Sequence, residues 1–189
     1  MAKVKGNLMM ARLSGSLGDQ FIVKRGRGGR TIVCKKPTFQ EDREFSPAQL
    51  ARQQAFREAA AYARTQKGNP VYIEKAEGTA KCSYNVAIAD YLHPPQILEI
   101  NLSGWVNGDG GTIRVRAQDD VRVEGVKVTI SDETGAFLEE GQATEMGALW
   151  WEYSTAHAAA NNMHVTVSAK DLPGHVTERT ELKGHPKVA

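Results

Sequence analysis

Seven short segments in the second half of the chain are rich in apolar residues, and the clearest of them alternate strictly with polar ones. The alternation is strict in Ile113–Ala117, Val126–Ile130 and Val165–Ala169. A two-residue period is typical of a strand with one buried face, and Gly/Asp-containing turn signals separate the segments. The expected strands are 97–102, 112–117, 125–130, 137–140, 149–154, 164–169 and 176–182. This spacing predicts a β-sandwich with Greek-key connections and a core anchored by Trp150 or Trp151.

The middle of the chain has helical periodicity instead. Ser46 suits an N-cap, Pro47 suits the first helical position, and the pattern runs to about Gln66. Its apolar stripe consists mainly of alanines and suits close packing against a helix or a sheet. Residues 70–77 fit a second short helix or an extended piece equally well. A further helix is expected over 84–92, capped by Ser83 and ended by the prolines after His93.

Near the N-terminus, two β-prone runs, 20–23 and 31–34, flank the glycine- and arginine-rich segment Arg25–Arg30. This is the pattern of a β-hairpin, and Asn7–Leu13 is a candidate for an earlier strand that ends at the Gly15/Gly18 turn. Because an isolated hairpin is marginally stable in water, it must pack on the rest of the chain or on another molecule.

These elements predict an α+β protein of two domains. Residues 1–95 form a basic β-hairpin and helical region, and residues 96–189 form an immunoglobulin-like β-sandwich. The boundary is placed at the proline pair that follows His93.

Charge is distributed unevenly although the net charge is only +2. Residues 1–36 carry nine Lys/Arg and one acidic residue, residues 37–93 are balanced, and residues 94–189 carry eight basic and fourteen acidic residues. One end of the chain is therefore +8 and the other −6. Such ends complement each other between neighbouring copies, and a contact between different surfaces propagates into a ring or a filament.

Two resemblances support this architecture. The strand expected over 164–169 ends in the pattern Ala-x-Asp-x-x-Gly, formed by Ala169, Asp171 and Gly174, and this ending resembles that of a late strand in bacterial immunoglobulin-like modules. A second resemblance covers nearly the whole chain and is to a group of uncharacterised bacterial proteins with the same two-part arrangement. It rests on the motifs Gly15–Phe21, Arg30–Val33, Lys36–Pro37, Phe45–Gln49, Phe56–Ala63, Ser83–Asn85 and Asp90–Leu92. The resemblance implies the architecture and no activity.

No residue pattern points to catalysis or to a cofactor. The histidines lack HxxxH or HExxH spacing, the serines lack a GxSxG elbow, and the glycines at 26, 28 and 29 match neither a P-loop nor a dinucleotide fingerprint. The histidines are His93, His157, His164, His175 and His185. We therefore predict that the protein is not an enzyme, and we assign no catalytic, cofactor-binding or metal-binding residue. Calcium near Asp119, Asp120 or Asp171 stays an open alternative to simple turn capping.

Cysteine content and hydropathy bear on disulfide bonding, export and membrane insertion. Cys34 and Cys82 form no CxxC pair, which favours two reduced thiols and leaves one long-range disulfide open. The first residues contain no apolar stretch of the kind found in a secretory signal, and no run is long enough to span a membrane. The chain is expected to be made in the cytoplasm, and a location outside the cell would need another export route.

Three function classes remain. The favoured one is a structural protein that assembles with itself into a filament, tube or other homopolymer, through its basic arm and by β-strand addition. The second is a nucleic-acid-binding protein that uses the Arg/Gly-rich segment, and the third is an enzyme. Exposed Trp105, Trp150 or Trp151 would suit an adhesin or carbohydrate-binding module, and a basic arm folded on its own acidic domain is the plainest alternative. The predicted assembly residues are Phe21, Val23, Lys24, Arg25, Arg27, Arg30, Ile32, Lys35 and Lys36.

Overall fold

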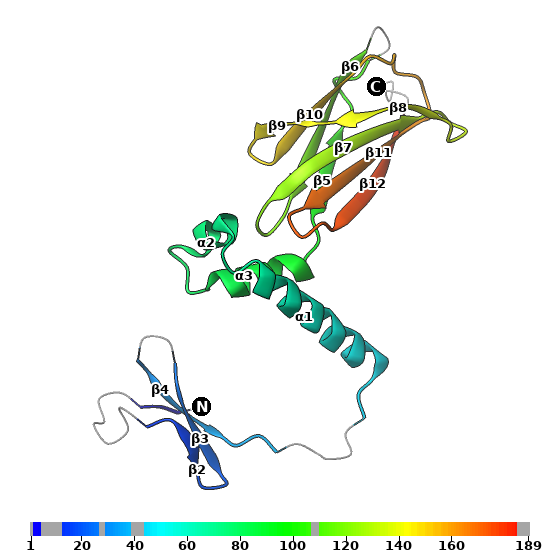
Figure 1. The fold of residues 1–189 in the computed structure, drawn as a ribbon. Helices are drawn as coiled ribbons and strands as arrows, with labels where there is room; N and C mark the ends of the chain where they lie inside the picture. The colour runs from blue at the N-terminus through cyan, green and yellow to red at the C-terminus, as the bar shows by residue number, and fades with distance from the viewer. Residues whose placement is uncertain (1, 5–12, 27–28, 39–43, 107–109, 185–189) are drawn as a thin grey trace. The chain divides into compact units, whose positions relative to one another are not determined.

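A computed structural model describes residues 2–4, 13–26, 29–38, 44–106 and 110–184 (Figure 1). The chain divides into two compact units, residues 1–46 and 47–189. The boundary predicted after residue 95 falls inside the second unit, between a helix and the first strand that follows it. The helices therefore share a compact unit with the strands that come after them.

The first unit contains one antiparallel sheet, which we call the N-terminal sheet. Its strands are β1 (Ala2–Val4), β2 (Gly15–Leu17), β3 (Phe21–Arg25) and β4 (Thr31–Lys35), in the order β1-β4-β3-β2. The predicted hairpin is present as β3 and β4, and the Gly26 amide donates to the Arg30 carbonyl where the connection begins and ends. Most of the strand expected over Asn7–Leu13 lies outside the described residues. The turn expected at Gly15 is instead the start of β2.

Three helices open the second unit: α1 (Pro47–Thr65), α2 (Pro70–Ala76) and α3 (Ser83–Leu92). Residues 70–76, which fitted two structures in the sequence, are helical, and the Asn69 side chain accepts the Val71 amide as an N-cap. Cys82, not Ser83, is the N-cap residue of α3, and it makes no side-chain capping bond. We call α1–α3 the helix cluster. No helix in the described ranges combines the length and apolar character needed to cross a membrane.

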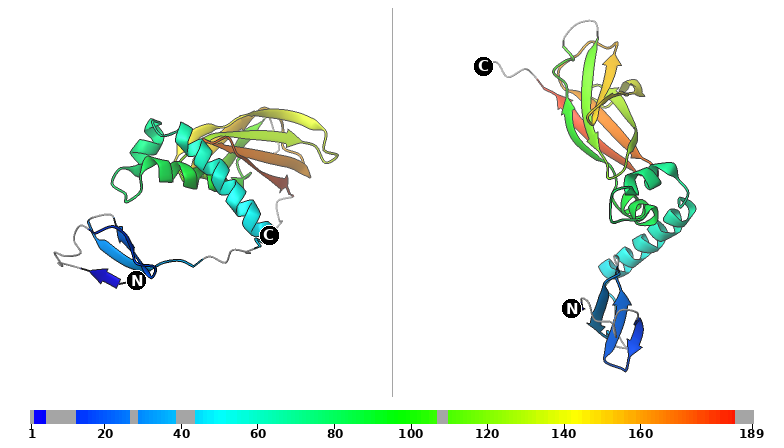
Figure 2. Two further views of the ribbon diagram at one scale, coloured as in Figure 1. Left: turned by 60° about the horizontal axis from the view of Figure 1, so that its bottom comes forward. Right: turned by 90° about the vertical axis from the view of Figure 1, so that its left-hand side faces the viewer.

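The remaining strands form two antiparallel sheets of four strands each, which we call the two-sheet part (Figures 1 and 2). The first sheet has the order β5-β6-β10-β9 and the second the order β12-β11-β7-β8. Their bounds are β5 Gln96–Asn101, β6 Gly111–Gln118, β7 Val123–Ser131, β8 Phe137–Gln142, β9 Thr144–Gly147, β10 Trp150–Thr155, β11 Met163–Asp171 and β12 Val176–Lys183. All seven expected strands are present, and β9 is an additional strand that the sequence pattern did not indicate.

The two sheets share one hydrophobic core, made by the inward positions of both. The alternating residues of β6, β7 and β11 are fully buried, as their period predicted. Trp151 belongs to this core, but the largest buried side chain is Trp105, which had been considered an exposed candidate. Trp105 is buried because its indole nitrogen donates to the His157 carbonyl oxygen at 2.8 Å, which satisfies its polar atom.

The two lateral edges of the two-sheet part are joined differently. On one side the chain passes from β8 in the second sheet to β9 in the first through Ala143, whose amide donates to the Val126 carbonyl. On the other side β5 and β12 lie next to each other. There Arg179 donates to the carbonyls of Ile97 and Leu98 at 3.3 and 3.0 Å.

Candidate assembly surface

The strand register places the predicted assembly residues on both faces of the N-terminal sheet. Phe21 lies opposite Lys35, and Lys24 lies opposite Ile32. Since successive residues of a strand point to opposite faces, Phe21 and Lys35 share one face while Lys24 and Ile32 share the other. The predicted residues therefore do not form one continuous patch.

Burial separates these residues further. Val23 is buried and Ile32 half-buried, so both stabilise the sheet itself. The exposed members of the set are Phe21, Lys24, Arg25, Arg30, Lys35 and Lys36. Arg27 lies outside the described residues.

Exposed apolar side chains lie next to the exposed cations. Leu17 of β2 is paired directly with Phe21 of β3, and these side chains are 54% and 44% exposed. Lys35 pairs with Phe21 on its other side. This face thus presents an apolar cross-strand pair beside a positive charge, which is a combination that suits a contact with an acidic, partly apolar surface.

The N-terminal half of α1 is a second exposed apolar element. Ala59 and Ala63 are buried in the helix cluster, as the alanine stripe predicted, but Ala48 and Ala51 are exposed. Leu50 and Phe56 are 50% and 54% exposed on the same half. Figures 1 and 2 show this half of α1 extending beyond α2 and α3. The first turns of α1 therefore have an apolar surface that the second unit does not cover.

A buried polar group joins the helix cluster to the two-sheet part. Asp90 of α3 is fully buried, and its Oδ2 accepts the Tyr72 hydroxyl at 2.5 Å. The Tyr72 hydroxyl is also 2.8 Å from that of Tyr62. Asp119, in the connection between β6 and β7, approaches Asp90, and its own Oδ2 accepts the amides of Val121 and Arg122.

Burial dominates the electrostatics of this group. The pKa of Asp90 is raised to about 7 in all, because burial raises it most, the Tyr72 hydrogen bond opposes this shift, and the nearby Asp119 carboxyl adds to it. Burial and the Asp90 contact also raise the pKa of Tyr72. Oδ1 of Asp90 and Oδ1 of Asp119 are buried without a partner among the described residues. A proton on Asp90 would supply this buried carboxyl group with a hydrogen-bond donor.

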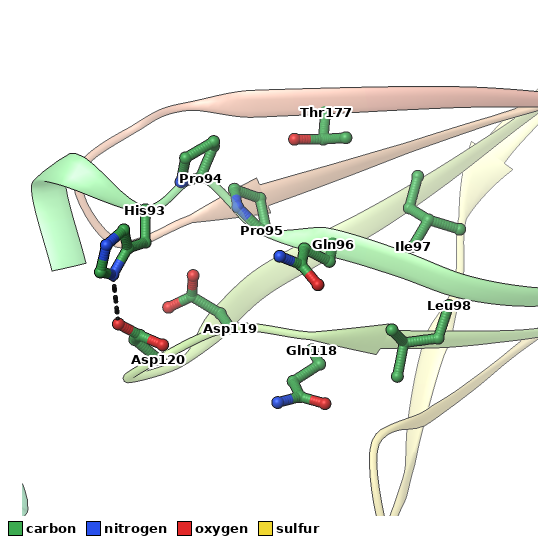
Figure 3. Close-up of a pocket in the computed structure, with 10 residues that line it drawn as sticks. All are labelled: His93, Pro94, Pro95, Gln96, Ile97, Leu98, Gln118, Asp119, Asp120 and Thr177. Atoms are coloured by element: carbon green, nitrogen blue, oxygen red, sulfur yellow. Dashed lines mark hydrogen bonds and ion pairs between the residues drawn. The ribbon is translucent and has the colours of Figure 1, made fainter. Parts of the chain in front are cut away.

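An open pocket of about 750 Å³ lies beside this junction, between the end of α3 and the β6–β7 connection (Figure 3). Figure 3 shows His93 and Asp120 next to each other, with Nδ1 and Oδ2 at 2.7 Å, while Thr177 comes from β12. Both members of the pair are exposed. The described lining contains one hydroxyl group, that of Thr177, and no serine or cysteine.

The aspartates considered for calcium have local partners. Asp119 caps its turn through the two amides, and buried Asp171 accepts the amides of Gly174 and His175 and contacts the His175 ring at 2.9 Å. Within the described ranges no group of three or more His, Cys, Asp or Glu side chains is arranged to hold a metal ion. The geometry at Asp119 and Asp171 is that of capped turns.

The other candidate side chains are dispersed. Cys34 and Cys82 are free thiols, the first half-buried and the second exposed. Trp151 and Trp105 lie in the core, and half-buried Trp150 lines a smaller pocket of about 400 Å³ with Asn101, Arg114 and Glu152. Of the three tryptophans considered for carbohydrate binding, Trp150 is therefore the one that is not buried.

Asp90 and Tyr72 were not identified from the sequence as a group. The signal was present for Asp90, because it follows Ala87 by one helical turn and so falls on the apolar face of α3. A carboxylate on an otherwise apolar helix face indicates a buried polar contact. Tyr72 gave no such signal, since its segment fitted both a helix and an extended piece.

Comparisons with known proteins add little to this geometry. The chain matches no family model and no curated protein. Among solved structures it is similar to an engineered protein determined at 1.98 Å by the Northeast Structural Genomics Consortium, with 22% identity and a TM-score of 0.36. That match covers 49% of this chain and 20% of the engineered one, so this chain spans about a fifth of that protein's length. The resemblance to a bacterial group with this architecture stays a prediction.

Proposed function

We propose that the protein is the structural subunit of a homopolymer, such as a filament or tube, and that the N-terminal sheet of one copy binds an acidic surface of the next. One observation carries the proposal. The N-terminal sheet belongs to its own compact unit and exposes the Leu17–Phe21 pair beside Lys35. Burying that pair against a second copy removes apolar surface from water and brings cations to carboxylates.

The contact is head-to-tail, because it joins two different surfaces of the same chain. A heterologous contact repeats at every copy, so it yields rings or open polymers instead of closed two-fold dimers. The charges of opposite sign at the two ends of the chain favour this orientation and disfavour contacts between like ends.

We further propose that the two-sheet part is an immunoglobulin-like sandwich. Taking β5, β6, β7, β8, β9, β10, β11 and β12 as strands A, B, C, C′, D, E, F and G, the sheet orders read A-B-E-D and G-F-C-C′. This is the distribution of strands between sheets that immunoglobulin-like domains have. Such domains commonly act as building blocks without an active site, which is an argument from fold alone.

The exposed half of α1 supports the same function. Leu50 and Phe56 gain burial only from a partner or from another part of the chain, and apolar helix faces of this kind commonly pack in assemblies. In a polymer this half of α1 would supply a second contact between neighbouring copies. Opposite charges would guide two copies together, and apolar packing would stabilise the contact between them.

The test is electron microscopy and sedimentation of the full chain, compared with two double variants. L17S/F21S removes the exposed apolar pair, whereas V176S/L182S removes two equally exposed apolar residues from β12. We expect regular polymers from the unchanged chain and from V176S/L182S, and small particles from L17S/F21S. Monodisperse small particles from all three proteins would overturn the proposal.

Nucleic-acid binding is the second candidate, and a specific observation favours it. Phe21 is exposed beside Lys35, which together offer a base-stacking face and a phosphate contact. Titration of labelled single- and double-stranded oligonucleotides with the full chain, at two salt concentrations, tests this candidate. Binding that weakens steeply with salt and is lost in K24E/K35E would favour it over self-assembly.

A further inference from the structure

The negative charge of the C-terminal part is concentrated in one stretch of the chain. Residues 128–169 contain no lysine or arginine and six carboxylates: Asp132, Glu133, Glu139, Glu140, Glu145 and Glu152. Five of the six lie between residues 132 and 145, in β8, in β9 or in the turn before β8. The acidic character is therefore a property of one place in the fold.

That place is a lateral edge of the two-sheet part. β8 is the edge strand of the second sheet, β9 is the edge strand of the first, and only Ala143 separates them along the chain. All four residues of β9 are exposed. Among the described strands, each pairs on one side alone, so both present backbone groups that another strand could bind. We call residues 137–149 the acidic edge.

Exposed apolar side chains accompany the carboxylates. Phe137 is 63% exposed and Met146 61%, and Leu149 is exposed in the turn after β9. That turn holds Ala148 and Leu149 at φ values of 50° and 70°, a left-handed conformation that costs about 1 kcal/mol for each residue with a β-carbon. Positive φ at both residues is what a two-residue type I′ connection between β9 and β10 requires, and this turn leaves Leu149 exposed.

We propose that the acidic edge is the surface to which the N-terminal sheet of a second copy binds. This inference rests on the proposed self-assembly and names its acceptor. The two surfaces are complementary in charge and in apolar content: Leu17, Phe21 and Lys35 on one, Met146, Leu149 and Glu145 on the other.

The opposite edge, formed by β5 and β12, is a less suitable acceptor for the N-terminal sheet than the acidic edge. β5 and β12 also expose apolar residues, Leu98 and Val176 among them. However, Arg179 and Lys183 lie on that edge, and both donate to backbone carbonyls there. With Glu99, Glu178 and Glu181 against these two cations, β5 and β12 together carry a net charge of −1. By contrast, β8, β9 and the turn between β9 and β10 contain three glutamates and no lysine or arginine, although Glu140 pairs with Lys127 of β7.

Cysteine cross-linking of the full chain tests the acceptor directly. In a C34S/C82S background, F21C is combined with M146C on the acidic edge or, as the matched control, with V176C on the opposite edge. The test position, Met146, and the control position, Val176, are both exposed apolar side chains on edge strands. After mild oxidation we expect a ladder of disulfide-linked dimers and larger multimers from F21C/M146C and its absence from F21C/V176C.

A second pair of variants, without added cysteines, checks the same assignment. E145K/M146S should abolish the polymers seen by electron microscopy, whereas V176S/E178K should leave them unchanged. Both pairs replace one exposed apolar residue and one exposed glutamate on an edge strand.

The outcomes separate this inference from the proposed function. Polymers that cross-link through V176C, or that form without a ladder from M146C, would overturn the acceptor and leave self-assembly standing. Absence of polymers and of ladders in every protein would overturn both. A cross-linked monomer from F21C/M146C would place the contact within one chain and would also overturn both.

Discussion

Asp90 is the residue at which burial and charge conflict most directly. From the helices, the hydroxyl of Tyr72 in α2 faces it, and this hydroxyl also contacts Tyr62 of α1. From the two-sheet part, Asp119 of the β6–β7 connection faces it, as does Asp171 at the end of β11, whose partner His175 follows in the β11–β12 connection. Within the described part of the chain, tyrosine hydroxyls and acidic groups lie closest to it, and no lysine or arginine pairs with the Asp90 carboxylate. The protonated form is the one this environment favours.

Stability should therefore depend on pH through Asp90. Its folded-state pKa of about 7 lies above the ordinary value of 3.8, so folding takes up a proton between these values. The contribution of Asp90 is complete below about pH 4 and is lost as the pH rises through about 7. We expect the free energy of unfolding to fall by on the order of 2 kcal/mol between about pH 5 and pH 8.

The variant D90N isolates this contribution, because the amide keeps the shape and is neutral at every pH. Urea denaturation of both proteins at about pH 5 and pH 8 measures it. D90N should show a much smaller decrease than the unchanged chain. Equal decreases in the two proteins would mean that Asp90 is ionised in the folded state at both pH values.

Gly141 on β8 is a second residue with a local steric requirement. A β-carbon at this position would lie 2.6 Å from Cε2 of Tyr153, which is buried and donates its hydroxyl to Glu139. G141A should therefore displace the ring and cost about 1–3 kcal/mol of stability, as overpacking does. G125A on β7 is the matched control, because its nearest neighbour would be 3.7 Å away. Thermal denaturation that shifts equally in both variants would contradict the contact with Tyr153.

At the scale of elements, α1 has two halves with different roles. Its C-terminal half packs Ala59 and Ala63 against the helix cluster, and its N-terminal half exposes Leu50 and Phe56. A63L should cost about 1–3 kcal/mol because Ala63 is fully buried in the helix cluster and a larger side chain would overpack it. F56A should change the free energy of unfolding by less than about 0.5 kcal/mol. Denaturation of the two variants measures this difference, and a large loss from F56A would mean that the exposed half is packed.

The sequence predicted the elements that have a strong period and missed those that do not. The expected start of α1 at Pro47, the β3–β4 hairpin and the seven strands are all present. β9 was missed because a four-residue edge strand with every side chain exposed shows no alternation. Trp105 was misjudged for a related reason: it follows β5 among turn residues, and only the fold brings the His157 carbonyl to its indole nitrogen.

The candidate site was less predictable than the fold. Composition identified the basic arm, but only the strand register shows that Val23 is buried and that Phe21 and Lys24 lie on opposite faces. Leu17, which pairs with Phe21, was not among the predicted residues because a three-residue strand is too short to recognise by pattern. Whether these residues bind a second copy is the prediction that the variants above test.

For the whole molecule, charge should affect the rate of assembly more than its final extent. Raising the salt concentration from about 0.1 M to 1 M shortens the screening length from about 10 Å to about 3 Å. We expect the initial rate of polymer growth to fall by roughly tenfold or more, since steering depends on long-range attraction. Light scattering measures the rate of polymer growth. The E178K variant, which changes a charge on β12 outside the acidic edge, serves as the charge control. A rate that is independent of salt would mean that the opposite charges of the two ends do not guide the contact.

The different closure of the two lateral edges has a mechanical consequence. A covalent backbone joins the two sheets at Ala143, whereas at the other edge the side chains of Arg179 and Lys183 bind carbonyls of β5 and of the residues that follow it. Under tension, side-chain hydrogen bonds break before a peptide bond does. A subunit under load should therefore open at the edge of Arg179 while staying closed at Ala143, and the strands could return to register when the force is released.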